Sequence, residues 1–330
     1  MQAPVDPHQT ESSDEPLERI EIDARAGAGE RVDRFLATQL TGVSRSRIQR
    51  WIDLGAVVCA ERPLARDTRL SGAERLTVTP QQPDAERAFR PEPVPLSIVA
   101  RGAEYLIIDK PAGLVVHPAP GNWGGTLMNG LLHLIPGSSR LPRAGIVHRL
   151  DKDTSGLMVV ALTERSRLRL IEDLSEHRVS RRYVAIAAGR LMADRSVHEP
   201  IGRDPRHRQR LAVVAGGKAA HTDLHPLADG SFEGKPFTVV ACRLHTGRTH
   251  QIRVHMASIG HPLLADPLYG GPCVDGLDRQ ALHAARLAFD DPCTGVPAGP
   301  FAAALPADLS DWLQGRGIDG DALTRAAFGP

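Results

Sequence analysis

Short apolar segments separated by turn residues divide the chain into predicted strands and a few amphipathic helices. Apolar residues at helical spacing over 32–36 predict a first helix. Ser44 is placed to cap a second helix over 45–54, which ends at a glycine. Short β-branched runs predict strands at 57–58 and 76–78. This part of the chain therefore predicts a small module of two helices and a few strands.

The remainder of the chain is richer in strand-like segments. Apolar runs long enough for strands lie at 97–99, 105–109, 157–162, 183–187, 211–214 and 237–241. Thr163 is placed to cap a helix over 164–177, and we expect Leu168, Ile171 and Leu174 to face inward. Because strands outnumber helices and short turns join many of them, the pattern predicts an α+β fold. Its helices are expected to flank a largely antiparallel sheet.

A second distinctive helix is predicted between 249 and 260. Thr249 is a candidate N-cap, and Gly260 marks the end of the segment. Ile252, Met256 and Ile259 recur on one face of this helix. The segment is therefore expected to pack on the core through that face.

Changes in composition suggest five parts. We expect a disordered acidic tail over 1–29, a small arginine-bearing domain over 30–80 and a Pro-rich linker over 81–95. A second domain over 96–309 carries most of the apolar runs, and 310–330 is expected to be a loose C-terminal tail with a short helix.

Charge is unevenly distributed along the chain. The formal net charge of the 330 residues is only +1, but residues 1–29 hold seven acids and two bases. The remaining residues therefore carry +6. An acidic tail masks a moderately basic body, which is compatible with an RNA partner although such clusters are often solvated faces.

The spacing of the cysteines and the length of the apolar runs indicate in which compartment the protein is expected. The four cysteines lie far apart and form no Cys-x-x-Cys pair, so neither a zinc ribbon nor a disulfide framework is predicted. The sequence shows no signal peptide and no run near the roughly twenty apolar residues of a membrane span. We therefore expect a cytoplasmic protein without a membrane partner.

The run His-Arg-Leu-Asp-Lys-Asp-Thr-Ser-Gly over 148–156 leads directly into the apolar run 157–162. Placing charged side chains next to a buried strand costs free energy. Such a segment is usually found where the charged groups form a binding or catalytic site. A calcium loop would need Glu at its twelfth position, which is Leu162 here. A structural turn and an aspartate-based phosphatase using Asp151 and Asp153 remain open alternatives.

Arg253 is expected in the first turn of the helix over 249–260, where the helix dipole disfavours a cation. Its position suggests a specific anionic partner. His245, His250 and His255 recur every five residues, a spacing that suits neither a helix face nor a strand face. No metal site is therefore predicted from them.

Three of these segments together resemble motifs of the RNA pseudouridine synthases, in the branch that modifies ribosomal RNA. The run 148–156 resembles the catalytic motif, Gly-Arg-Thr-His-Gln-Ile-Arg-Val-His over 247–255 resembles the third motif, and Arg-Arg-Tyr-Val-Ala over 181–185 resembles the motif with a tyrosine. The run 110–118 is similar to the first motif, and the match extends from about 32 to 309 in the same order.

The resemblance implies a role for each catalytic candidate. Asp151 would be the nucleophile, and Arg253 would pair with it and hold it ionised and oriented. Tyr183 would stack on the target uracil. Arg149 would fill the space that the flipped nucleotide leaves. The structural alternatives are an ordinary salt bridge for Arg253 and a half-buried core tyrosine for Tyr183.

The helix over 45–54 resembles that of the S4 domain, a module that docks an arginine-bearing helix on RNA. Arg45, Arg47 and Arg50 are its candidate RNA-binding residues, and Arg248 is a further candidate in the second domain. The following stretch, Val-Val-Cys-Ala-Glu over 57–61, departs from the S4 pattern. An amphipathic helix pair with a solvated basic face is the alternative.

Together these features predict an enzyme that isomerises uridine to pseudouridine in large-subunit ribosomal RNA. The resemblance implies no cofactor and no metal, and a monomer is the default expectation. A synthase acting on other ribosomal or transfer RNA sites and a non-enzymatic S4-type RNA-binding protein remain as alternatives.

Overall fold

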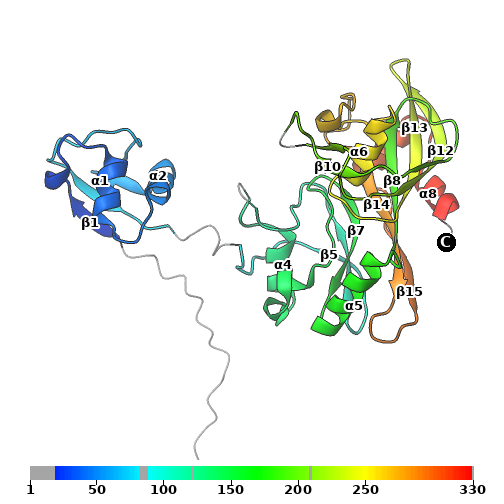
Figure 1. Cartoon of the computed structure of the whole chain (residues 1–330), viewed down its shortest axis with the longest axis horizontal. Helices are drawn as coiled ribbons and strands as arrows, with labels where there is room; N and C mark the ends of the chain where they lie inside the picture. The colour runs from blue at the N-terminus through cyan, green and yellow to red at the C-terminus, as the bar shows by residue number, and fades with distance from the viewer. Residues whose placement is uncertain (1–18, 82–87, 120–121, 208–209, 329–330) are drawn as a thin grey trace, which may run out of the picture. The chain divides into compact units, whose positions relative to one another are not determined.

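A computed structural model describes residues 19–81, 88–119, 122–207 and 210–328 (Figure 1). The chain forms two compact units, Met1–Asp84 and Ala85–Pro330. Among the described residues, no helix has the length and apolar character that crossing a membrane requires.

The first unit packs two helices, α1 (Val32–Gln39) and α2 (Arg45–Asp53), on a small antiparallel sheet. The strands are β1 (Ile20–Asp23), β2 (Val57–Cys59), β3 (Arg62–Pro63) and β4 (Arg75–Val78), in the order β1-β4-β2-β3, and a 3-10 turn spans Arg25–Gly27. Ser44 accepts a hydrogen bond from the backbone N–H of Arg47, which confirms the predicted cap. Phe35, Ile48 and Trp51 lie in the core of this unit.

The expected acidic tail over 1–29 is wrong in its second half. Residues 20–23 form β1, which pairs with β4 from Ile20 opposite Val78 to Asp23 opposite Arg75. The strand alternates charged and apolar residues, so its acids face solvent while Ile22 packs against the core. Residues 1–18 lie outside the described residues.

The second unit is built on a nine-stranded sheet. Its strands are β5 (Ser97–Arg101), β6 (Tyr105–Lys110), β7 (Ser155–Ala161), β8 (Ser180–Ala188), β9 (Arg195–Val197), β12 (Thr222–Phe232), β13 (Lys235–Leu244), β14 (Leu282–Asp290) and β15 (Pro297–Ala302). They run in the order β5-β6-β7-β14-β8-β13-β12-β9, with β15 beside β14. The pair β7–β14 is parallel and the other neighbouring pairs are antiparallel, which confirms the mostly antiparallel α+β prediction.

Helices and short connections complete this unit. The helices are α4 (Leu127–Leu134), α5 (Glu164–Ser175), α6 (Gln251–Ser258), α7 (Ala307–Gln314) and α8 (Gly320–Phe328). Three 3-10 turns span Ser138–Arg140, Pro142–Gly145 and Pro267–Tyr269. A separate hairpin joins β10 (Ile201–Arg203) to β11 (Leu211–Val213).

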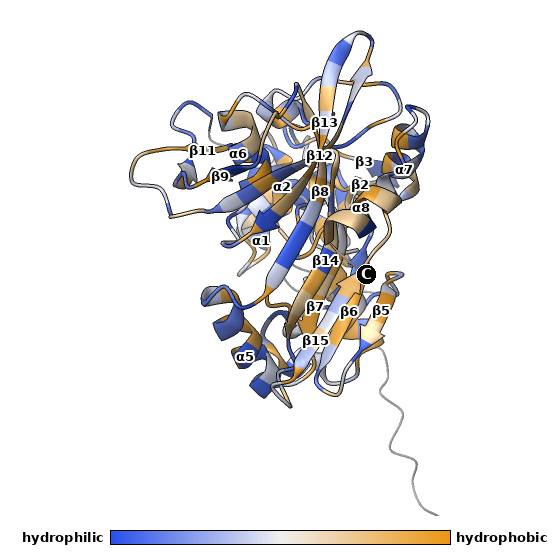
Figure 2. Ribbon diagram, turned by 90° about the vertical axis from the view of Figure 1, so that its right-hand side faces the viewer, coloured by the Kyte–Doolittle hydropathy of each residue, from blue (hydrophilic) through white to orange (hydrophobic). Residues whose placement is uncertain are grey.

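The two faces of the sheet have different cores, as the alternation of side chains along β8 shows. Tyr183 and Ala185 contribute to a core shared with α4 and α6. Val184 and Ile186 point the other way and contribute to a core that contains Trp312 of α7. Figure 2 shows α7 and α8 beside β8. The face that carries Tyr183 and is covered by α4 and α6 also borders the cavity described below.

Two packing expectations in this unit are wrong. In α5, which Thr163 caps as predicted, Leu168 is 56% and Ile171 is 40% exposed, and Leu170 is buried instead. Helical periodicity shows that a face is apolar but does not say which face meets the sheet. The expected loose tail over 310–330 is also wrong, because α7 and α8 pack on the sheet and Leu313 has no exposed surface.

Candidate active site

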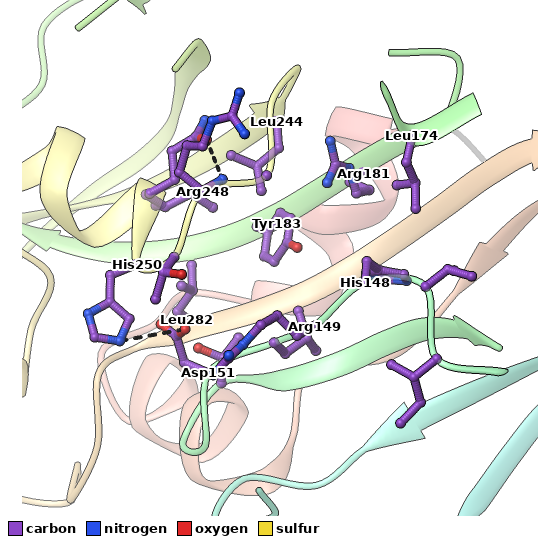
Figure 3. A pocket seen from close by; sticks show the side chains of 18 of the residues that line it. His148, Arg149, Asp151, Leu174, Arg181, Tyr183, Leu244, Arg248, His250 and Leu282 are labelled. Atoms are coloured by element: carbon purple, nitrogen blue, oxygen red, sulfur yellow. Dashed lines mark hydrogen bonds and ion pairs between the residues drawn. The ribbon is translucent and has the colours of Figure 1, made fainter. Parts of the chain in front are cut away.

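A cavity of about 390 Å³ opens on the α6 side of the sheet. Its walls come from the loop before β7, the start of β8 and the loop between β13 and α6 (Figure 3). Polar and charged residues line much of it: His117, Arg143, His148, Arg149, Asp151, Thr154, Ser175, Arg181, Tyr183, Arg248, Thr249, His250, Gln251 and Arg253. Segments that are more than a hundred residues apart in the sequence therefore meet around one space.

Asp151 and Arg253 are in direct contact. Arg253 donates from Nη1 to Oδ2 of Asp151 over 3.2 Å, and the two side chains are 8% exposed for Arg253 and 15% exposed for Asp151. The bidentate contact of this guanidinium is made elsewhere, with Asp266, at 2.8 Å from Nε and 2.9 Å from Nη2. Asp266 has no exposed surface. Burial acts to lower the pKa of Arg253, but the hydrogen bonds and charges of Asp266 and Asp151 outweigh it and raise that pKa.

His250 lies on the other side of the Asp151 carboxylate. Its Nε2 is 3.8 Å from Oδ1 of Asp151, and its Nδ1 is 2.8 Å from the hydroxyl of Tyr269. That hydroxyl accepts the backbone N–H of Leu211 over 3.2 Å, so its own proton is available for Nδ1. We infer from this network that the ring proton lies on Nε2, directed toward Asp151.

The predicted cap of α6 at Thr249 is wrong. His250 is the N-cap, with a φ of 55° and no capping hydrogen bond from its side chain. A left-handed backbone is costly for a residue other than glycine and is maintained only where the surroundings impose it. Here it turns the imidazole into the cavity. Burial lowers the pKa of His250, while the charge of Asp151 opposes that shift.

Arg181 and Tyr183 lie two residues apart on β8, so both side chains are on the same face of the strand and line the cavity. Tyr183 is 5% exposed, and burial raises its pKa to about 12, so it is protonated at neutral pH. Arg181 donates from Nη2 to the carbonyl of His245 over 3.2 Å. Within the described residues, Nε of Arg181 and Nε2 of His117 are buried without a hydrogen-bond partner.

Buried polar contacts hold the loop that carries Asp151. Lys110 has no exposed surface and donates to the carbonyls of Pro111, Leu114 and Lys152. Burial lowers its pKa to about 8. These bonds tie the end of β6 to the loop before β7, so the loop has a fixed position relative to the sheet.

The glycine that ends the 148–156 run is required by packing. Gly156 has a φ of 114°, and a Cβ there would lie 2.3 Å from the carbonyl oxygen of Ala284. Ala284 and Gly156 are partners in the parallel pairing of β14 with β7. The run must therefore end in a residue without a side chain where β7 enters the sheet.

The expected RNA-binding residues lie in both units. Arg149 is exposed and lines the cavity beside Asp151 (Figure 3). Arg248 also lines the cavity and donates from Nε to the carbonyl of Ala219 over 3.0 Å. The expected catalytic residues Asp151, Tyr183 and Arg253 therefore share one cavity with Arg149 and Arg248.

Arg45, Arg47 and Arg50 all belong to α2 of the first unit. Arg45 pairs with the buried carboxylate of Asp33 over 2.9 Å, and Arg47 lies over the ring of Trp51 at 5.5 Å. Burial opposes the shift, but hydrogen bonds from Gln49, Arg45 and Arg31 lower the pKa of Asp33 to about 2. Arg45 therefore has a structural partner within its own unit.

The three regularly spaced histidines do not share one ligand position. His250 faces Asp151, His255 lies 2.9 Å from the hydroxyl of Thr222, and His245 lies 2.6 Å from Asp223. Asp223 belongs to a separate group of side chains with metal-ligand character, which also contains His221.

Several residues of the site had no role assigned to them from the sequence, although His117 and Arg181 lie in the runs 110–118 and 181–185 that resemble family motifs. The residues without an assigned role are His117, Arg181, Asp266 and Tyr269, together with the contact of His250 to Asp151. A weak signal exists for two of them, since Asp266 and Tyr269 flank a proline directly after the segment that ends α6.

Comparison with known proteins identifies the family of this chain. Residues 104–258 match the model of the family described as RNA pseudouridylate synthase, and two curated relatives are 40% and 46% identical to this chain over alignments that cover 87% of it. The chain belongs to this family.

Two relatives carry the name ribosomal large subunit pseudouridine synthase D. The protein of Neisseria meningitidis serogroup B is 46% identical over 299 residues, which covers 87% of this chain and 79% of the relative. The protein of Escherichia coli K12 is 40% identical over 300 residues. The alignment covers 87% of this chain and 90% of the relative. The solved structure of human RNA pseudouridylate synthase domain containing 1 has a TM-score of 0.53 at 27% identity, over 67% of this chain and 88% of that one.

Proposed function

We propose that this chain isomerises uridine to pseudouridine in the RNA of the large ribosomal subunit. The observation that carries the proposal is the mostly buried carboxylate of Asp151, held by Arg253 on the wall of a cavity of about 390 Å³. The names of the relatives from Neisseria meningitidis and Escherichia coli support the substrate. The site of action would be the cytoplasm, with the protein as a monomer.

Asp151 acts as the nucleophile in this proposal. The reaction breaks the bond from uracil N1 to the ribose and forms one from C5, so no electrons are gained or lost and no cofactor is needed. Arg253 keeps the carboxylate oriented through Oδ2, and the Nε2 proton of His250 is directed toward Oδ1. Attack at ribose C1′, attack at uracil C6 and removal of the 2′ proton remain the three chemical routes.

The target base must leave the RNA stack to reach Asp151, which costs on the order of a few kcal/mol. The exposed guanidinium of Arg149 is placed to fill the vacated space, since its plane can stack and donate hydrogen bonds. Tyr183 offers a protonated phenol and a ring face for the uracil. Arg181 and His117 also line the cavity that would receive the nucleotide.

The first unit serves as an S4-like RNA-binding module in this proposal. The support is its pair of helices on a small sheet and the three arginines of α2. We assign the phosphate contacts of this helix to Arg45, Arg47 and Arg50.

The test is to map pseudouridines in total RNA from a strain that lacks this protein. Loss of modified positions confined to large-subunit ribosomal RNA supports the proposal. Loss in transfer RNA alone would redirect it to another substrate. An unchanged map, together with purified protein that binds RNA but forms no pseudouridine, would favour a non-enzymatic RNA-binding protein.

A further inference from the structure

Three histidines gather at the ends of three neighbouring strands, outside the cavity that holds Asp151. Thr222 of β12 lies opposite Leu244 of β13 on one side and Val197 of β9 on the other. His221, His245 and His198 flank these three paired positions in the sequence. The sheet register therefore brings together side chains from three separate segments of the chain.

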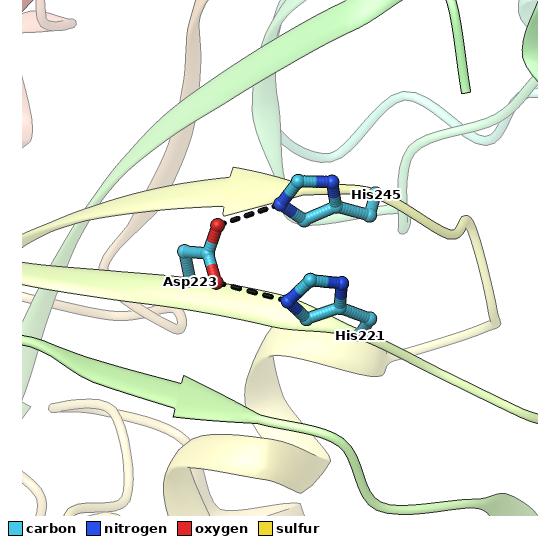
Figure 4. Close-up of side chains that lie close together, drawn as sticks. All are labelled: His221, Asp223 and His245. Carbon is cyan, nitrogen blue, oxygen red and sulfur yellow. Dashed lines mark hydrogen bonds and ion pairs between the residues drawn. The ribbon is translucent and has the colours of Figure 1, made fainter.

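The nitrogens of this group converge on one carboxylate. Nε2 of His221 is 2.9 Å from Oδ1 of Asp223, and Nε2 of His245 is 2.6 Å from Oδ2 (Figure 4). The hydroxyl of Ser196 donates to Oδ1 of Asp223 over 2.6 Å and lies 3.0 Å from Nε2 of His198. Three imidazole nitrogens, a hydroxyl and a carboxylate thus surround one small volume.

The rings lie in a stack rather than spread over the surface. The ring centroids of His198 and His221 are 3.8 Å apart, and those of His221 and His245 are 3.9 Å apart with planes 4° from parallel. Three imidazole rings packed in this way beside one carboxylate form a compact group of donor atoms.

We propose that His221, Asp223 and His245 bind one divalent transition-metal ion such as Zn²⁺. The three ligand atoms lie within 4.8 Å of one another, so one ion can contact all of them. Two imidazole nitrogens and a carboxylate oxygen are a donor set that Zn²⁺ accepts in three-ligand sites that keep a further position for water. The hydroxyl of Ser196 lies beside that further position, 2.6 Å from Oδ1 of Asp223 and 2.9 Å from Nε2 of His221.

Metal binding requires a small rearrangement of the rings. An ion bonds imidazole in the ring plane at about 2.0–2.1 Å, which two parallel rings cannot both provide. His221 and His245 must therefore rotate apart, and the ring proton of each must move from Nε2 to Nδ1. Their side chains are 27% and 24% exposed, so the stack has an open side toward which the rings can turn.

The ion would join the ends of β12 and β13 beside the loop that lines the cavity. The backbone N–H of His221 donates to the hydroxyl of Thr246, which donates to Gln251 at 2.7 Å. Gln251 also accepts the backbone N–H of Arg248. Metal binding is thus expected to stabilise this loop, without entering the reaction, because none of the three ligands lines the cavity.

The test is a titration of the full-length, tag-free chain with Co²⁺ and Zn²⁺ after removal of metals. The exposed Cys273 and Cys293 are replaced by Ser so that thiolates do not contribute. We expect one equivalent of Co²⁺ to bind with visible absorption bands that Zn²⁺ displaces. His245→Gln should weaken the affinity by about 100-fold, since losing even an outer-shell partner costs roughly 10–100-fold.

A matched control lies on the same strand. His225 pairs with Asp194 in an exposed contact that has one imidazole rather than two, so His225→Gln should leave the titration unchanged. Equal affinity in the wild type and in His245→Gln, or no saturable binding below millimolar Co²⁺, would overturn the proposal. Pseudouridine formation should persist in chelator, so failure of the metal site and failure of the proposed function give different results.

Discussion

The hydroxyl of Tyr269 lies 2.8 Å from Nδ1 of His250, and this contact decides which nitrogen of the imidazole faces Asp151. Tyr269 also places its ring 5.0 Å from the guanidinium carbon of Arg253. One side chain thus orients both groups that flank the Asp151 carboxylate. It comes from a turn beyond α6, and its influence on the nucleophile is indirect.

Tyr269→Phe should reduce kcat by about 10–100-fold, because misplacing a catalytic group by about 1 Å has an effect of that order. The phenylalanine ring keeps the packing on Arg253 but lets Nδ1 of His250 carry the proton, which turns a lone pair toward Asp151. The measurement is the kcat and KM of pseudouridine formation over a range of pH. We expect KM to stay within roughly two- to three-fold of the wild type.

Tyr105→Phe is the matched control, since Tyr105 packs edge-on against Phe289 in a core apart from the cavity. Its activity should equal that of the wild type. If Tyr269→Phe changes only the thermal stability and leaves kcat and its pH profile untouched, Tyr269 does not position His250.

Asp151→Asn should reduce pseudouridine formation by more than about 10⁴-fold, because an amide of the same shape cannot act as a nucleophile. The hydrogen bond from Arg253 can remain, so the fold and RNA affinity should be retained. Product formation by mass spectrometry and RNA binding by filter retention measure the two properties separately.

Asp153→Asn distinguishes the synthase from an aspartate-based phosphatase. Asp153 lies two residues further along the same loop and does not line the cavity. We expect this variant to keep most of its synthase activity, in chelator as well as in magnesium. Turnover that survives in Asp151→Asn would remove Asp151 from the role of nucleophile.

Asp266→Asn should destabilise the second unit by about 3 kcal/mol, since Arg253 is a buried cation that would lose its bidentate anionic partner. The Asp151 carboxylate would then be the anionic contact left to this guanidinium among the described residues, so activity should fall as well. Urea unfolding at neutral pH measures the change in the free energy of unfolding.

Asp53→Asn provides the comparison, because Asp53 makes a bidentate contact with Arg66 in which both side chains are exposed. Its loss should cost about 1 kcal/mol or less. Equal effects of the two substitutions would mean that the contact of Asp266 with Arg253 is not the dominant buried pair that its geometry indicates.

Local features of the sequence were sufficient to predict several elements. Ser44 and Thr163 each accept a hydrogen bond within the first turn of their own helix, so their effect depends on neighbours three residues away. The 148–156 run likewise carries its own turn residues and its glycine. Such features are predictable because the contacts that define them are short in sequence.

The rest of the site depends on contacts that are long in sequence. Asp266 and Tyr269 reach Arg253 and His250 only because of the way the chain turns after α6. The approach of His221 to His245 depends on the register of β12 with β13. No spacing rule within one segment predicts these contacts, and the regular spacing of the histidines around α6 did not identify their partners.

The protein should lose stability on mild acidification because of the buried His283 and the partly buried His148. Burial lowers the pKa of His148 to about 3 and that of His283 to about 4, against an ordinary value of 6.5. The folded pKa is depressed in both cases, so the unfolded chain binds more protons between about pH 4 and 6.5. The stability is fully present above pH 6.5 and is lost as the pH falls toward 4, by about 1.4 kcal/mol per pH unit for each histidine.

His148→Gln tests this assignment without removing the contact. Nε2 of His148 accepts the backbone N–H of Val159 over 3.0 Å, and the amide oxygen of glutamine can accept the same bond but does not titrate. The free energy of unfolding in urea should fall between about pH 7 and pH 5 by about 2 kcal/mol less in this variant than in the wild type. If both proteins show the same pH dependence, the histidine that titrates on unfolding is not His148, and the acid sensitivity must come from His283 or from other groups.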